Sequence, residues 1–315
     1  MSMLPTTPAC ELATCPVGRH WLIEGLWSRQ AVGIVGGEPK CWKSFLALDM
    51  AVSVSSGKPC LGRFAALDTG RVLLHAAEDA QHIVRQRLEG LARSRAVALD
   101  DLDIQVVTAP SVRLDITADR NNLSETVAAL RPKLLILDPF VRMHRCDENL
   151  SVEVAPLLAF LRELQRAFAV SVVLVHHAKK GAGRIRAGQA LRGSSELHAW
   201  GDDNLYLRRL SDDVVTLTTE HRAAPPEGPF DLALETADGG FSLRVQTAKE
   251  RAEQPAPLDP QQRVLDALRS ADEPLTMAAL RATCRMRTQL VCTILGSLRA
   301  AGRIHKTDAG YRLAS

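Results

Sequence analysis

The residues with the clearest chemical potential lie in GGEPKCWKS, at positions 36 to 44. Counted back from Lys43, this stretch fits the phosphate-loop pattern Gly-x4-Gly-Lys-Ser, except that Trp42 replaces the second glycine. In such a loop, backbone N–H groups and a helix N-terminus bind phosphate. A lysine bridges the β- and γ-phosphates, and the next hydroxyl ligates Mg²⁺. We therefore expect ATP and Mg²⁺ as cofactors, with Ser44 as a metal ligand. The expected nucleotide-binding residues are Gly37, Glu38, Pro39, Lys40, Cys41, Trp42, Lys43, Ser44 and Phe45.

Trp42 is the departure from the pattern. Glycine at that position allows tight curvature and close approach of the backbone to phosphate. A non-glycine residue at positive φ costs about 1–2 kcal/mol, which a domain tolerates. Two interpretations stay open. Either the indole points away from the phosphates and the loop works, or the strand-turn-helix has lost nucleotide binding.

Polar residues also end three apolar runs. Asp138 ends LLILD, Glu78 follows RVLLHAA, and His176 and His177 end SVVLVHH. A parallel sheet binds its ligands at these carboxyl ends. We expect Asp138 to order the Mg²⁺ shell, Glu78 to act as general base towards water, and one histidine to contact the γ-phosphate. The alternatives are a turn cap at Asp138 and solvated strand-end side chains elsewhere.

The elements that would position these residues alternate along the chain. Continuous apolar strands separated by helical patterns predict an α/β fold with a mostly parallel sheet, covered on both faces. Two later runs predict closing, antiparallel strands. The expected strands are 31–37, 71–79, 102–110, 133–140, 171–178 and 203–210, then 214–222 and 230–235; the expected helices are 45–57, 80–96, 123–132 and 150–168.

The length of 315 residues favours two domains over one. Residues 1–18 are rich in Pro and Thr and predict a flexible leader, followed by the α/β core over 19–246. TAKERAEQPAPLDP contains three prolines and predicts a linker over 247–259. Residues 260–315 show three helical patterns and a hairpin, which is the order of a winged-helix domain.

Charge and cysteine content restrict the class of protein. The net charge is +3, and residues 258–315 hold nine Lys or Arg against five Asp or Glu. The positive excess therefore lies in the tail and indicates an anionic partner there. Seven cysteines without a CxxC pair favour reduced thiols. Because no long apolar run or signal peptide is visible, we expect a soluble, cytoplasmic protein without membrane association.

Two basic segments are the expected contacts to DNA. AKKGAGRIRAGQALRG, after His177, has no acidic residue and no aromatic residue for base stacking. It predicts phosphate contacts to single-stranded DNA, with a lid over the active site as the alternative. The helical segment 287–302 predicts a recognition helix for duplex DNA, with protein binding as the alternative. The expected contact residues are Lys179, Lys180, Arg184 and Arg186 in the first segment, and Arg285, Arg287 and Arg299 in the tail.

Taken together, these motifs resemble the RecA-like P-loop ATPases, and among them the RepA-type hexameric helicases of plasmid replication. The resemblance is carried by WLIEGLWSRQAVGIVGGEPKCWKSFLALDMA, LLHAAEDA, LVHHAKKGAG and LRGSS, and it covers roughly residues 20 to 235. It implies Lys43 as phosphate ligand, Glu78 as general base, Asp138 as the Walker B acid and His177 as sensor of the γ-phosphate. It also implies a homo-oligomer, with a hexamer as the family's form, that hydrolyses ATP at subunit interfaces.

In such assemblies a neighbouring subunit supplies an arginine to the site. EHRAAPPEG is similar to the Lys-x-Arg-x-Gly-Pro segment of DnaB helicases, which makes Arg222 the expected arginine. Glu220 replaces the lysine of that segment. Arg208 and Arg209 are the alternatives, although surface charge is the simpler interpretation of both.

The sequence thus predicts an ATP-hydrolysing, DNA-associated motor that resembles the RepA-type helicases. The alternative is a DNA-binding regulator whose modified core serves as a nucleotide switch or an oligomerisation module. The motor predicts hydrolysis stimulated by single strands, whereas the regulator predicts sequence-specific duplex binding with slow or no turnover.

Overall fold

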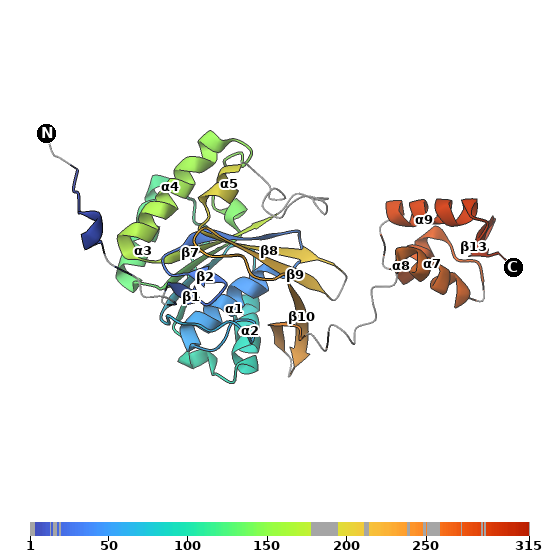
Figure 1. The fold of residues 1–315 in the computed structure, drawn as a ribbon, viewed down its shortest axis with the longest axis horizontal. Coiled ribbons are helices and arrows are strands. Elements are labelled where there is room, and N and C mark those ends of the chain that lie inside the picture. Colours follow the sequence, from blue (N-terminus) through green and yellow to red (C-terminus); the bar gives the residue numbers. More distant parts are fainter. Residues whose placement is uncertain are drawn as a thin grey trace. The chain divides into compact units, whose positions relative to one another are not determined.

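The computed structural model describes residues 4–12, 14, 18, 20–177, 195–210, 214–237, 240–247, 250, 259–271, 273–284, 286 and 288–314. The chain divides into two compact units, Met1–Gln246 and Thr247–Ser315 (Figure 1). Each unit has its own hydrophobic core.

The first unit is built on a nine-stranded sheet, as far as the described residues show, in the order β11-β10-β9-β8-β3-β7-β6-β4-β5. Neighbours from β5 to β8 pair in parallel, and β9, β10 and β11 continue the sheet antiparallel. The predicted α/β fold with a mostly parallel sheet is therefore confirmed. The strands are β3 (Val32–Gly37), β4 (Val72–Ala76), β5 (Ile104–Val106), β6 (Leu134–Asp138), β7 (Ser171–His177), β8 (Asp203–Arg209), β9 (Val215–His221), β10 (Phe230–Ala237) and β11 (Gly240–Val245). A small hairpin, β1 (Trp21–Ile23) and β2 (Trp27–Ser28), precedes them.

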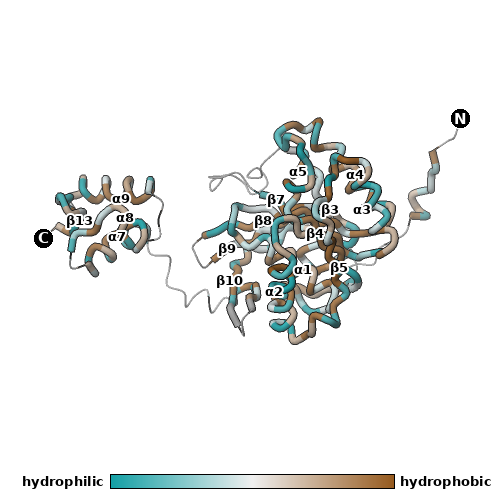
Figure 2. Tube along the Cα trace, turned by 180° about the vertical axis from the view of Figure 1, so that it is seen from behind, coloured by the Kyte–Doolittle hydropathy of each residue, from teal (hydrophilic) through white to brown (hydrophobic). Residues whose placement is uncertain are grey.

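Helices cover both faces of this sheet, which is why its central strands read as continuous apolar runs. One face carries α1 (Lys43–Ser56) and α2 (Gln81–Ser94), and the other α3 (Thr117–Leu130) and α4 (Ser151–Phe168) (Figure 1). Strand β7 shows the alternation: Val173 and Val175 join the core under α1, whereas Val172 and Leu174 join the core under α4. Figure 2 shows hydrophobic segments along the central strands and hydrophilic ones along α2.

The sequence prediction missed the hairpin β1–β2 and helix α5 (Ser195–Trp200), and two further differences have a clear physical reason. Helix α3 begins at Thr117, six residues before the predicted start. The sequence did not reveal these six residues because only Leu123 and Val127 of the helix are buried, so its first turn has no apolar repeat. Strand β11 was missed because its side chains are mixed: Leu243 is buried, but Phe241 is 42% exposed. An edge strand with one covered face gives a weaker apolar signal than a central strand.

The second unit contains α7 (Pro260–Arg269), α8 (Met277–Cys284), α9 (Thr288–Ala300), β12 (Ile304–Thr307) and β13 (Gly310–Leu313). Asp259 caps α7 by accepting from the Gln261 N–H, and Pro260 occupies the first turn. The three helices and the hairpin enclose a separate apolar core. Within the described part of the chain, no helix is long and apolar enough to cross a membrane.

A buried ion pair fixes helix α1, which begins with Lys43. Asp49 on α1 is fully buried, and one of its carboxylate oxygens lies 2.6 Å from Arg95 Nη2 at the end of α2. The other oxygen accepts from the Leu61 N–H and the Cys60 thiol. Burial raises the pKa of Asp49, and the Arg95 charge opposes that rise. Arg95 therefore compensates a carboxylate that water does not reach.

Arg95→Ala is expected to lower the free energy of unfolding by about 3–5 kcal/mol, because it leaves the buried Asp49 charge without its partner. Denaturant unfolding followed by circular dichroism would measure the change. Arg93→Ala, two residues earlier and exposed, is the matched control and should stay within about 0.5 kcal/mol of the wild type. Equal losses in the two variants would contradict this role.

Candidate active site

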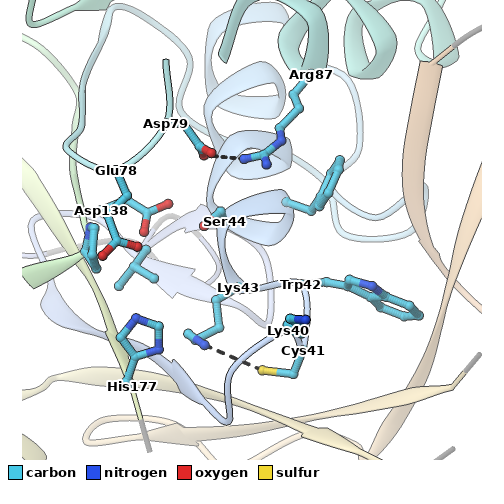
Figure 3. Close-up of a pocket in the computed structure, with 13 residues that line it drawn as sticks. Lys40, Cys41, Trp42, Lys43, Ser44, Glu78, Asp79, Arg87, Asp138 and His177 are labelled. Carbon is cyan, nitrogen blue, oxygen red and sulfur yellow. Dashed lines mark hydrogen bonds and ion pairs between the residues drawn. The ribbon is translucent and has the colours of Figure 1, made fainter. Parts of the chain in front are cut away.

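A cavity lies between the N-terminus of α1 and the carboxyl ends of β4, β6 and β7 (Figure 3). It brings together residues that are far apart in the sequence, including the loop lysine and the polar strand-end residues. Gly37, Glu38 and Pro39 precede this lining. The lining residues are Lys40, Cys41, Trp42, Lys43, Ser44, Phe45, Glu78, Asp79, Arg87, Asp138, Pro139, Val175 and His177.

The phosphate loop connects the end of β3 to the start of α1. Gly37 is required by close packing, because a Cβ there would lie 2.3 Å from the Leu207 carbonyl oxygen and 2.6 Å from Cys41 Sγ. Two other loop residues, Lys40 (φ 63°) and Trp42 (φ 64°), are left-handed. Trp42 thus adopts the conformation that normally favours glycine.

The Trp42 indole leaves the phosphate side of the loop open. Trp42 occupies the N-cap position of α1, and its half-buried ring packs against the core of the first unit. In Figure 3 the ring points away from Asp138, Glu78 and the Lys43 amino group. The Arg209 guanidinium carbon lies over the ring, 5.6 Å from its centroid. The geometry therefore favours a loop that tolerates Trp42.

Lys43 is held along the inside of the loop. Its side chain is buried, and Nζ donates to the Glu38 carbonyl oxygen at 2.8 Å and lies 3.8 Å from Cys41 Sγ. Burial lowers the pKa of Lys43, whereas the nearby Cys41 and Asp138 oppose that shift. A bound phosphate would replace the Glu38 carbonyl oxygen as the hydrogen-bond acceptor of Lys43 Nζ. It would also place negative charge next to this buried cation.

Asp138 ends β6 and is buried beside Ser44. Burial raises the pKa of Asp138 to about 6; the hydrogen bond from Ser44 opposes the rise, and the charges of Asp79 and Glu78 add to it. A buried carboxyl crowded by two acidic neighbours, with a hydroxyl in contact, suits a divalent cation. Among the described residues, no group of three or more His, Cys, Asp or Glu could hold a metal by itself. Mg²⁺ at this site would therefore need phosphate and water oxygens as further ligands.

Glu78 and Asp79 follow β4 and have different partners. Arg142 Nε donates to Glu78 Oε1 at 2.7 Å. The Arg142 side chain is 62% exposed and the Glu78 side chain is 44% exposed. Asp79 is instead paired with Arg87 on α2 (Figure 3), and Arg87 stacks over the Phe45 ring. Glu78 is thus the more accessible carboxylate of the two. The sequence pattern gave no sign of either arginine.

Strand alternation separates the two histidines at the end of β7. His177 lines the cavity. His176 is buried elsewhere, with Nδ1 3.6 Å from Glu148 Oε1 and its ring beside Phe140. Of the two candidates that the sequence left open, the structure brings His177 to the loop.

A family model described as "AAA domain" matches residues 2–183, more than half of the chain. The chain belongs to this family. It is a P-loop ATPase by family, and its sheet and phosphate loop are those of the RecA-like fold.

Two solved structures resemble this AAA protein. One, titled "The Structure Of A DnaB-Like Replicative Helicase And Its Interactions With Primase", matches with a TM-score of 0.50 and 16% identity over 68% of this chain. The match covers 57% of the helicase chain, so this protein spans little more than half of that relative. The other, the RadB recombinase, has a TM-score of 0.49 and 18% identity, with 69% of this chain and 92% of that one covered. At this identity, the likeness to the helicase shows a shared fold.

Arg222 of the AAA protein lies away from its own phosphate loop. Its backbone N–H donates to the Asp202 carbonyl, and its guanidinium contacts the Asp202 carboxylate at 3.0 Å. Strand register places Asp203 beside Gly33, at the start of β3, whereas the loop begins at the other end of that strand. Arg222 therefore lies beside the amino-terminal end of β3, whereas the phosphate loop follows the carboxyl end of that strand. It cannot contact the phosphate loop of its own chain.

The predicted DNA contacts are mostly outside the described residues. This applies to Lys179, Lys180, Arg184 and Arg186 in the segment after His177, and to Arg285 and Arg287 in the tail. Arg299 is described and is exposed near the end of α9.

Proposed function

We propose that the protein hydrolyses ATP as an oligomer and uses the energy to move along or remodel DNA in the cytoplasm, as a RepA-type helicase does. The observation that carries the proposal is the single cavity that contains Lys43, Ser44, Glu78, Asp138 and His177. These side chains come from four separate elements, and together they supply the phosphate-binding, metal-binding and proton-accepting groups of phosphoryl transfer.

Each residue has a specific role in this mechanism. The α1 N-terminus and Lys43 bind the β- and γ-phosphates. Ser44 and Asp138 would hold Mg²⁺, and the bound ion would neutralise charge on the phosphate oxygens. Glu78 accepts a proton from the attacking water, and Arg142 holds its carboxylate at the cavity edge. His177 contacts the γ-phosphate.

The catalytic arginine of this mechanism comes from a second copy of the chain. Arg222 supports this assignment because it is 58% exposed and lies far from its own loop. A site that needs a neighbour's arginine is complete only in an assembly, and repeated head-to-tail contacts form a ring when the rotation between neighbours closes. A hexamer is the form that we propose.

For the DNA contacts, we assign single strands to the basic segment after His177 and duplex DNA to the second unit. The second unit is proposed to be a winged helix, with α9 as its recognition helix. Its three helices, its hairpin and its excess of positive charge support this assignment.

A regulator is the second candidate function. The observations that favour it are a separate, compact second unit and a phosphate loop with two left-handed non-glycine residues. In that case the second unit would find a duplex sequence, and the core would bind nucleotide as a switch or join subunits.

Removal of residues 247–315 separates the two functions of the chain. The shortened protein should keep its ATP turnover and its single-strand stimulation, but lose at least about tenfold in duplex affinity, because it loses helix α9 and the positive excess of the second unit. Fluorescence anisotropy with labelled single and double strands, at one fixed salt concentration, measures both affinities. Unchanged duplex affinity would show that the second unit is not the duplex reader. Sequence-specific duplex binding by a full chain without turnover would favour the regulator.

A further inference from the structure

We propose that Arg209 is a positioning residue for the phosphate loop of its own chain, and that it makes Trp42 compatible with nucleotide binding. The inference rests on the proposed function, because it concerns the same ATP site. It differs from the sequence interpretation of Arg209 as surface charge or as a neighbour's catalytic arginine.

Arg209 reaches the loop because of strand register. It is the last residue of β8, which pairs in parallel with β3, and Leu207 of β8 is the partner of Gly37. Two residues beyond that pair, the Arg209 side chain lies next to the loop that follows Gly37.

The guanidinium contacts both strained parts of the loop. Arg209 Nη2 donates a hydrogen bond to the Lys40 carbonyl oxygen. The same guanidinium lies over the Trp42 ring, 5.6 Å from its centroid. Lys40 and Trp42 are the two non-glycine residues of the loop with positive φ. The Arg209 side chain thus contacts both positions at which a non-glycine residue is strained by the loop conformation.

These two contacts offset the strain of the loop. A hydrogen bond from a charged donor and a cation–π contact each favour the state in which the loop is formed. Arginine suits the position because its planar group can stack on an indole while its N–H groups donate in the plane, whereas a lysine cannot do both. Glycine at position 42 would remove the strain and the ring at that position, but not the strain at Lys40. About half of the contribution of Arg209 to ATP binding therefore depends on Trp42, and the other half on its contact with Lys40.

The test is a double-mutant cycle on ATP affinity, measured by calorimetry with Mg²⁺ present. Arg209→Ala should weaken ATP binding about tenfold, the effect of losing a charge-assisted hydrogen bond and its stacking contact. At saturating ATP its kcat should stay within about twofold of the wild type, because the residue acts on loop geometry and not on the reacting atoms. Arg209→Lys should be intermediate. Arg208→Ala, its exposed neighbour on β8, is the control and should bind as the wild type does.

The decisive comparison is between the effect of Arg209→Ala in the wild type and its effect in the Trp42→Gly variant. In that variant, Arg209→Ala should weaken ATP binding only about threefold, because the strain and the ring at position 42 are gone while the hydrogen bond to the left-handed Lys40 remains. The same loss in both backgrounds would overturn the inference, as would wild-type affinity in Arg209→Ala. A second readout needs no nucleotide: tryptophan emission should shift to the red in Arg209→Ala as the indole loses its cover, and an unchanged spectrum would also overturn the inference. If the wild type fails to bind ATP, or Lys43→Ala binds it equally well, the proposed function itself is wrong.

Discussion

Glu78→Gln is expected to abolish ATP hydrolysis while ATP binding stays intact. The glutamine keeps the size and hydrogen-bonding capacity of the side chain but cannot accept a proton from water. General-base catalysis contributes about 10²–10⁴ in rate, so turnover should fall by that factor. Phosphate release under saturating ATP gives the rate, and calorimetry with the same variant gives the affinity.

Asp79→Asn is the matched control for that experiment. Asp79 is the next residue along the chain and lines the same cavity, but it is paired with Arg87. Its loss should therefore alter the packing of α2 near the loop and leave most of the turnover. If Asp79→Asn stops hydrolysis and Glu78→Gln does not, the two carboxylates have been assigned the wrong way round.

Arg222→Ala is expected to cause a comparable or larger loss. An arginine supplied in trans is worth about 10³–10⁵ in rate, because it stabilises charge that develops on the transferred phosphoryl group. The variant should still bind ATP, since Arg222 lies at the opposite edge of the sheet from its own loop. Arg208→Ala, the sequence alternative, should retain near wild-type turnover.

Mixing two inactive variants shows whether Arg222 acts across an interface. Lys43→Ala has lost its own site but keeps the arginine, whereas Arg222→Ala has lost the arginine but keeps its site. In an equal, random mixture about a quarter of head-to-tail interfaces combine an intact site with an intact arginine, so about a quarter of the wild-type rate should return. A mixture that stays inactive would show that the arginine does not act in trans.

The local parts of the site could be predicted from the sequence. The strand that leads into the loop before Lys43, the strand that ends at Asp138 and the strand that ends at His177 are each one continuous apolar segment, whose burial on both faces leaves a strong local signal. Their order along the chain was sufficient to place them at one edge of a parallel sheet.

Contacts across strands could not be predicted in the same way. Arg209 and Lys40 are 169 residues apart, and only the register of β8 against β3 brings them together. The pairing of Arg142 with Glu78 likewise depends on the turn after β6. The effect of Trp42 could not be predicted for the same reason. Its ring is covered by Arg209, and the spacing of residues in the sequence does not identify that partner.

Steady-state ATP hydrolysis by the purified chain, with and without single-stranded DNA and beside Lys43→Ala, tests the central claim most directly. We expect turnover that rises with single-stranded DNA and disappears in Lys43→Ala, because we propose the buried amino group of Lys43 as the ligand of the β- and γ-phosphates. Absence of turnover in the wild type, with or without DNA, would contradict the account and favour the regulator.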